Sequence, residues 1–131
     1  MKISMCLGAG LLAGAAALTS PMAAAQTTPD FYAGKMVTVV VGFTPGGGYD
    51  QYARLLARHY GKYLPGNPTS IVRNMPGAGH MRATQFMNSQ APKDGTYIAV
   101  VNNGIPLEQV VSGAEVRFDV RKFNWIGSAG L

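Results

Sequence analysis

The chain has 131 residues, of which 47% are hydrophobic, and it carries a formal net charge of +5. This length suits one small domain or a piece of a larger one, and the apolar content excludes a disordered chain. The 17 glycines cluster in loops without a fixed period, which excludes a fibrous repeat. The basic residues are scattered and form no run interleaved with aromatic residues, so nucleic acid is not an expected partner.

The first 25 residues have the features of a secretory signal peptide. Lys2 supplies a positive start, and an apolar stretch follows from Ile3 to Leu18. The stretch is shorter than the roughly 20 residues that a spanning helix needs, which makes a membrane anchor the less favoured alternative. Small residues before Gln26 suit a signal peptidase. We therefore expect cleavage after Ala25, export to the periplasm and loss of Cys6, the single cysteine.

The next segment predicts a strand, a glycine loop and a helix. Residues 35–41 are β-branched or apolar on both faces, which is typical of a strand buried on both sides. A glycine-rich breaker at 42–48 follows, and a helix is predicted from about Tyr49 to Tyr63. Asp50 lies in its first turn, where a negative charge suits the helix dipole. One face of this helix is expected to pack on the core: Tyr52, Leu55, Leu56, His59, Tyr60 and Tyr63.

The same order of elements recurs along the rest of the chain. The predicted elements are strand 69–73, glycine loop 74–79, helix 80–90, strand 96–101, polar loop 102–104 and helix 105–111. Met81, Thr84 and Met87 are expected to face inward from the second helix. The strands begin roughly 30 residues apart, which is the size of one βαβ unit. The expected fold class is therefore α/β, with a parallel sheet and right-handed crossovers.

The loops after the strands are the predicted binding region. In a parallel sheet these loops meet on one edge, where open α/β sheets bind ligands. Both glycine loops open a helix, whose N-terminus presents unpaired N–H groups and roughly half a positive charge. The arrangement favours a phosphate or carboxylate near Gly46–Gly48, facing Gly77–Gly79. The alternative is that both loops are only tight turns. The motifs of a P-loop and of a dinucleotide fold are missing.

Catalysis finds little support in the sequence. There is no G-x-S-x-G elbow, and the six carboxylates form no evident acid–base pair. The two histidines lack metal-ligand spacing, so we expect no enzyme, no cofactor and no metal. His59 is expected in the core or at its rim, and Trp125 is expected to pack. His80 has two open interpretations, contact with a ligand or exposure to solvent in the first turn.

Three segments of the chain resemble receptors of tripartite tricarboxylate transporters, also called Bug-type receptors. Pro45-Gly-Gly-Gly-Tyr-Asp50 and the helix after it resemble the P-G-G-G-x-D segment of that family. Asn74-Met-Pro-Gly-Ala-Gly79 resembles its N-x-P-G-A-G segment, and Pro92-Lys-Asp-Gly-Thr-Tyr97 resembles the segment before its third strand. The segments occur in the family's order and spacing.

The resemblance implies a two-lobed periplasmic binding protein of the second structural type. Such a protein closes around a small organic anion, usually a carboxylate, and delivers it to membrane permease subunits. Residues 26–131 would form the first lobe, as a fragment without the second lobe. The resemblance carries the ligand-binding role to the following residues: Phe43, Thr44, Gly46, Gly47, Gly48, Tyr49, Asp50, Pro76, Gly77, Ala78, Gly79, His80, Asn102 and Asn103.

Two residues depart from the family's pattern, and one further function stays open. Many members have Thr where this chain has Tyr49, and Gly where it has His80, so the resemblance does not name the ligand. The alternative function is a periplasmic ligand-sensing protein of the same fold that acts on a signalling partner such as a membrane kinase. Neighbouring genes would separate the two: permease subunits favour transport, and a histidine kinase favours sensing.

Overall fold

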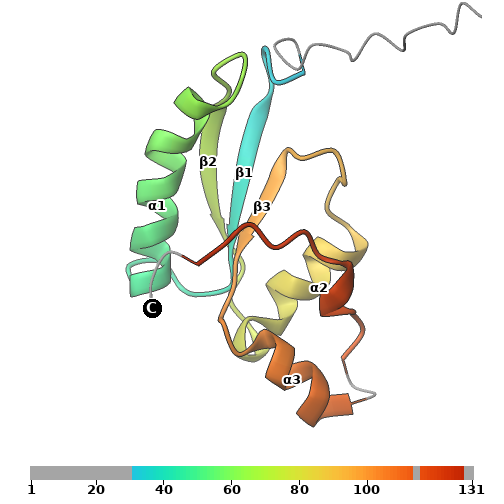
Figure 1. Ribbon diagram of the computed structural model, residues 1–131. Coiled ribbons are helices and arrows are strands. Elements are labelled where there is room, and N and C mark those ends of the chain that lie inside the picture. The colour runs from blue at the N-terminus through green and yellow to red at the C-terminus, as the bar shows by residue number, and fades with distance from the viewer. Residues whose placement is uncertain (1–30, 114–115, 129–131) are drawn as a thin grey trace, which may run out of the picture.

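Three parallel strands form the centre of the fold. A computed structural model describes residues 31–113 and 116–128, so the predicted signal peptide at 1–25, with Cys6, lies outside the described residues. The strands are β1 (Met36–Val41), β2 (Thr69–Asn74) and β3 (Tyr97–Val100), and they lie in the order β2-β1-β3 (Figure 1). Both pairings of β1 are parallel, which confirms the predicted α/β class.

The central strand β1 is the most buried element of the sheet. Val37, Val39, Val40 and Val41 have no exposed surface, as expected for a strand with apolar residues on both faces. The register places Val41 opposite Asn74 of β2 and opposite Val100 of β3. The carboxyl ends of all three strands therefore lie side by side, as the sequence predicted.

The helices cover the two faces of this sheet. They are α1 (Gly48–Tyr60), α2 (Met81–Ser89) and α3 (Ile105–Ser112). Short 3₁₀ turns extend α1, precede α2 and follow α3, at Gly61–Tyr63, Ala78–His80 and Val120–Lys122. Figure 1 shows α1 on one side of the strands, with α2 and α3 on the other. Val39 and Val41 pack with Ala53 of α1. Val40 packs with Ala83 of α2 and with Met75, which follows β2.

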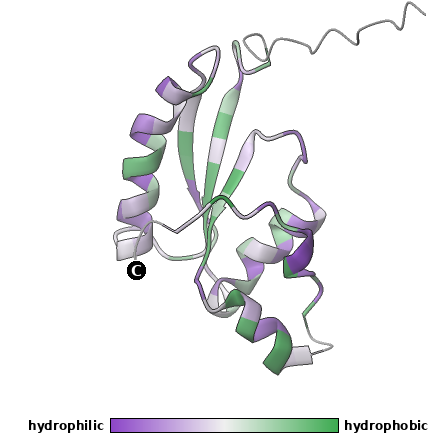
Figure 2. Cartoon of the chain, in the orientation of Figure 1, coloured by the Kyte–Doolittle hydropathy of each residue, from purple (hydrophilic) through white to green (hydrophobic). Residues whose placement is uncertain are grey.

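The buried face of α1 differs from the predicted one. Asp50 and Ala53 are buried and Ala57 is half-buried, so the small residues of the helix face the sheet. The expected core residues on the other face are exposed, a correction that includes His59: Tyr52, Leu55, Leu56, His59 and Tyr63. The alanines have short side chains, so the helix axis comes close to the strands and the larger residues are directed outward. Apolar residues accordingly alternate with polar ones along α1 in Figure 2.

The prediction for α2 was more accurate than that for α1. Thr84 is buried, while Met81 and Met87 are half-buried. Trp125 packs edge-on against the Phe123 ring, with centroids 6.1 Å apart, but it remains 55% exposed. Its indole Nε1 donates a hydrogen bond to the Val120 carbonyl at 2.9 Å. Within residues 31–113 and 116–128, no helix has the length and apolarity needed to cross a membrane.

Candidate anion site at the carboxyl edge of the sheet

The first loop ends at an exposed helix N-terminus. Gly47 is the N-cap of α1 and offers no side-chain cap, and the Gln51 amide donates to the Gly47 carbonyl at 3.0 Å. The amides of residues 48–50 therefore precede the first hydrogen bond within the helix. Thr44 and residues 46–48 are exposed, and a Cβ added at Gly48 would meet no atom within 4 Å. An anion could approach these amides from solvent.

Asp50, in the first turn of α1, is buried and accepts three hydrogen bonds. It is 2% exposed. Its Oδ2 accepts from Arg54 Nε and from the Gly46 amide, both at 2.8 Å, and its Oδ1 accepts from Asn74 Nδ2 at 2.8 Å. The hydrogen bond from Arg54, followed by those from Gly46 and Asn74, holds the pKa of Asp50 well below its ordinary range. The Asp50 carboxylate thus holds the first loop in place, and the Gly46 amide, which donates to it, is not free to bind an anion.

Asn74 connects the first loop to the end of β2. Besides its bond to Asp50, its Nδ2 donates to the Phe43 carbonyl at 3.0 Å. Arg54 Nη2 donates to Asn74 Oδ1 at 3.4 Å. Asn74 and Arg54 were absent from the predicted site, although a polar residue at the end of a half-buried strand is a signal that could have identified Asn74. Both residues position the first loop.

A row of three rings joins the first loop, α1 and the second loop. Phe43 stacks on Tyr49 with ring centroids 4.2 Å apart and an interplanar angle of 5°. Phe43 also lies 5.1 Å from the His80 ring, tilted by 44°. The two loops that the sequence assigned to one site are therefore in contact, and the half-buried Phe43 and Tyr49 pack on the core beneath them.

His80 lies inside the protein, so the solvent-exposed interpretation is wrong. It is 7% exposed, and its Nδ1 has no hydrogen-bond partner. Burial lowers the pKa of His80, and the negative charge of Glu108 on α3 opposes this shift. A lowered pKa favours the neutral imidazole near pH 7.

The second loop has an unusual backbone. Four consecutive residues have positive φ: Gly77 at 141°, Ala78 at 44°, Gly79 at 55° and His80 at 71°. For Ala78 and His80, the left-handed conformation costs about 1–2 kcal/mol each. Residues 76–79 are exposed, so no dense packing covers this turn. Such strain is often found where a backbone is shaped for a ligand, and it is compatible with the predicted role of this loop.

In the third loop, the Asn102 side chain forms a hydrogen bond within the loop itself. Asn102 Oδ1 accepts a hydrogen bond from the Gly104 amide at 2.7 Å, and Asn102 is half-buried. Asn103 is exposed. Of the two predicted residues in this loop, only Asn103 has its side chain in solvent. Over the described part of the chain, no group of three or more His, Cys, Asp or Glu residues could hold a metal ion.

Comparison with known proteins finds a similar curated protein. The chain is 36% identical over 119 residues to the UPF0065 protein in the gbd 5′ region of Cupriavidus necator. The match covers 90% of this chain but 35% of the relative, so the chain spans about a third of the relative's length. No protein-family model matches the chain, and no solved structure matches it.

Proposed function

We propose that this chain forms one wall of a receptor for a small organic anion, most simply a carboxylate. The observation that carries the proposal is the exposed N-terminus of α1, where the amides of residues 48–50 lie beside an Asp50 already paired with Arg54. A helix N-terminus carries roughly half a positive charge. Because Arg54 balances the Asp50 carboxylate, that partial charge stays available to an incoming anion.

The second loop supplies the facing side of this site. Its exposed left-handed turn, at residues 77–79, is connected to the first loop through the contact of His80 with Phe43. Tyr49 stacks on the same Phe43 ring, so we infer that Tyr49 and His80 position the two loops from beneath the site.

The similarity to a UPF0065 protein supports a role in transport. UPF0065 is another name of the tripartite tricarboxylate receptor family. We propose that the protein is exported to the periplasm and delivers its anion to permease subunits of a transporter of that type. Residues 26–131 would correspond to the first lobe. A ligand bound to one lobe alone would stay exposed to solvent on its other side, so we expect residues 26–131 by themselves to bind it with about millimolar affinity.

A titration of the 15N-labelled chain with succinate tests the site directly. We expect saturable shifts of the amides of residues 48–50, which are the groups assigned to the anion. Gly47 has φ −77°, and a Cβ added there lies 3.8 Å from the Thr44 carbonyl oxygen, so a side chain fits without strain. Gly47→Asp should abolish the shifts by placing a carboxylate at the amides, whereas Gly47→Ala, which adds no acceptor, should largely keep them.

Both substitutions add a Cβ at the same position, but only Asp brings a charged side-chain acceptor that can take the amide of residue 49 or 50. Equal loss of binding in both variants would show that bulk, not charge, blocks the site. Undiminished succinate binding by Gly47→Asp would contradict the assignment of the anion to α1.

A further inference from the structure

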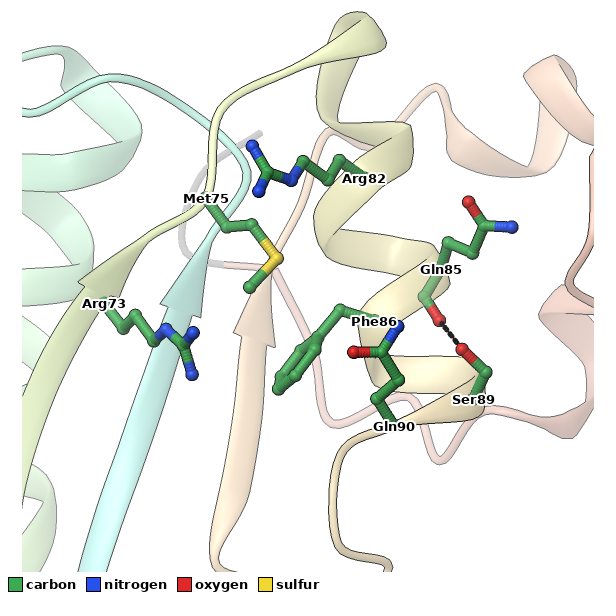
Figure 3. Close-up of a pocket in the computed structure, with 7 residues that line it drawn as sticks. All are labelled: Arg73, Met75, Arg82, Gln85, Phe86, Ser89 and Gln90. Carbon is green, nitrogen blue, oxygen red and sulfur yellow. Dashed lines mark hydrogen bonds between the residues drawn. The ribbon is translucent and has the colours of Figure 1, made fainter.

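A hollow beside α2 is lined by two arginines that have no acidic partner among the described residues. This hollow, here called the α2 hollow, has a volume of about 390 Å³. Seven residues line it: Arg73, Met75, Arg82, Gln85, Phe86, Ser89 and Gln90. Figure 3 shows Arg73 reaching from β2 and Arg82 from α2 toward the space around Met75 and Phe86. None of these residues belongs to the site at the N-terminus of α1.

The hollow follows from the way in which α2 covers the sheet. Along β2, Ser70, Val72 and Asn74 are half-buried, whereas the alternate residues Ile71 and Arg73 are exposed. Helix α2 packs its Ala83 and Phe86 on Val40 and Tyr97, which belong to β1 and β3. The outer face of β2 is therefore left uncovered next to the helix.

The charge in the α2 hollow is positive, and no acidic side chain in the described ranges 31–113 and 116–128 is paired with it. Among the described residues, the ion pairs are Arg54–Asp50 and Arg121–Asp119, and neither includes Arg73 or Arg82. The acidic residues that the structure describes all lie outside the lining of the hollow: Asp50, Asp94, Glu108 and Asp119. Two guanidinium groups, each able to bind a carboxylate through paired N–H donors, thus border the same space.

Neighbouring groups hold both arginines in place and leave their donors available. The Arg73 guanidinium lies over the Phe86 ring, 5.4 Å from its centroid. The stem of Arg82 runs along the second loop, since a Cβ added at Gly77 would lie 3.4 Å from Arg82 Cδ. Met75 is buried between them, and Phe86 is half-buried, so the hollow has an apolar floor. Ser89 Oγ donates to the Gln85 backbone carbonyl, and Gln85 and Gln90 also line the hollow.

We propose that the α2 hollow is a second binding site, for a small organic anion with an apolar body. The acidic groups of the ligand pair with Arg73 and Arg82, and its hydrocarbon part lies on Met75 and Phe86. The volume is within the range of small-molecule pockets. This site differs from the one proposed at α1 because it uses side-chain guanidinium groups and an apolar floor, not backbone amides.

Titration of the 15N-labelled chain with adipate tests the proposal, with inorganic phosphate as the comparison anion. We expect saturable shifts at the amides of residues 73–75 and 82–90. Arg73→Gln and Arg82→Gln should each weaken this binding about tenfold, as expected for the loss of a hydrogen bond between charged groups. The control is Arg58→Gln, an exposed arginine on α1, which should leave the affinity unchanged.

Three results would overturn the proposal. These are no saturable shift at the hollow, shifts that both Gln variants leave unaltered, and phosphate binding there as tightly as adipate, which would show that the apolar floor is not used. If Arg82→Gln disturbs the spectrum elsewhere, Arg82→Lys replaces it, because Lys keeps the charge and loses the paired donors. Gly47→Asp should leave adipate binding at the hollow unchanged, which separates this test from that of the α1 site.

Discussion

The Asn74 side chain at the end of β2 donates to the Asp50 carboxylate in the first turn of α1, with Nδ2 and Oδ1 2.8 Å apart. The same Nδ2 holds the Phe43 carbonyl at 3.0 Å. One side-chain amide therefore ties the glycine loop to the neighbouring strand and fixes the position of the backbone amides of residues 48–50. Preorganisation of this kind lowers the cost of ordering a binding loop.

Asp50→Asn should destabilise the chain in a manner that depends on pH. The folded state lowers the pKa of Asp50, so its contribution is fully present above the unfolded value of about 4 and is lost as the pH falls toward the folded value. We expect the variant to unfold at lower urea concentration than the wild type at pH 7. The difference should narrow between pH 4 and pH 2.

Asp119→Asn is the matched control for Asp50. Its pairing with Arg121 lowers the pKa of Asp119 to about 2, but Arg121 is exposed to solvent. Exposed pairs contribute little, so this variant should remain close to wild type at every pH. A gap for Asp50→Asn that is equally wide at pH 7 and pH 3 would show that its charge does not stabilise the fold.

His80 should make the chain less stable as the pH falls below about 6.5. Burial lowers its pKa in the folded state, so the unfolded chain takes up the proton first, and protonation favours unfolding. His80→Asn tolerates the left-handed backbone at φ 71° and stays neutral. Urea midpoints between pH 7 and pH 5 should fall for the wild type and stay nearly constant for this variant. The exposed His59→Asn should behave like wild type, and a pH-independent wild type would refute the argument.

Gly42→Ala should be costly, whereas Gly48→Ala should not. A Cβ at Gly42 would lie 2.5 Å from the His80 Cβ and 3.1 Å from its Cα, so the second loop would have to move. We expect a loss of about 1–3 kcal/mol in the free energy of unfolding, as for other overpacked sites. Gly48 begins α1 with open space around it, and Ala there should be neutral or stabilising by about 0.4–1 kcal/mol. Urea unfolding of both variants checks the contrast, and equal effects would contradict the close contact.

Changes in side-chain size should lower the free energy of unfolding on the buried face of α1 and hardly affect it on the exposed face. Ala53 is fully buried against Val39 and Val41, so Ala53→Leu should cost about 1–3 kcal/mol by overpacking. Leu55 is 53% exposed, and Leu55→Ala should stay within about 0.5 kcal/mol of wild type. Chemical denaturation of the pair measures both values. A larger loss for Leu55→Ala would restore the helix face that the sequence predicted.

Hydrophobic patterning predicted the strands well and the helix face poorly. All five residues from Val37 to Val41 are buried, on alternating faces of β1, as expected for a central parallel strand that is covered on both faces. In α1, the regular spacing of Tyr52, Leu55 and Leu56 indicated a core face. The helix instead packs on the sheet through the small Ala53 and Ala57, because these short side chains let the helix and the strands come close together.

The candidate site was predictable only in its backbone. Glycine loops after parallel strands indicated where amides would be exposed, and the structure brings both loops together through Phe43 and His80. The burial of His80 depends on its positive φ and on the close approach of Gly42, neither of which has a pattern in sequence. The α2 hollow likewise depends on how far α2 extends over β2, which is a property of packing.

The strand order β2-β1-β3 also has a consequence for how the chain folds. Strand β1 precedes both of its neighbours in sequence, and its partners begin 33 and 61 positions later, at Thr69 and Tyr97. No hairpin can form early to protect its valines, because each pairing must first close a long loop. The apolar strand β1 is therefore synthesised before either of its partner strands and stays unpaired until they follow. We expect slow folding, with a transient tendency of β1 to associate with other chains.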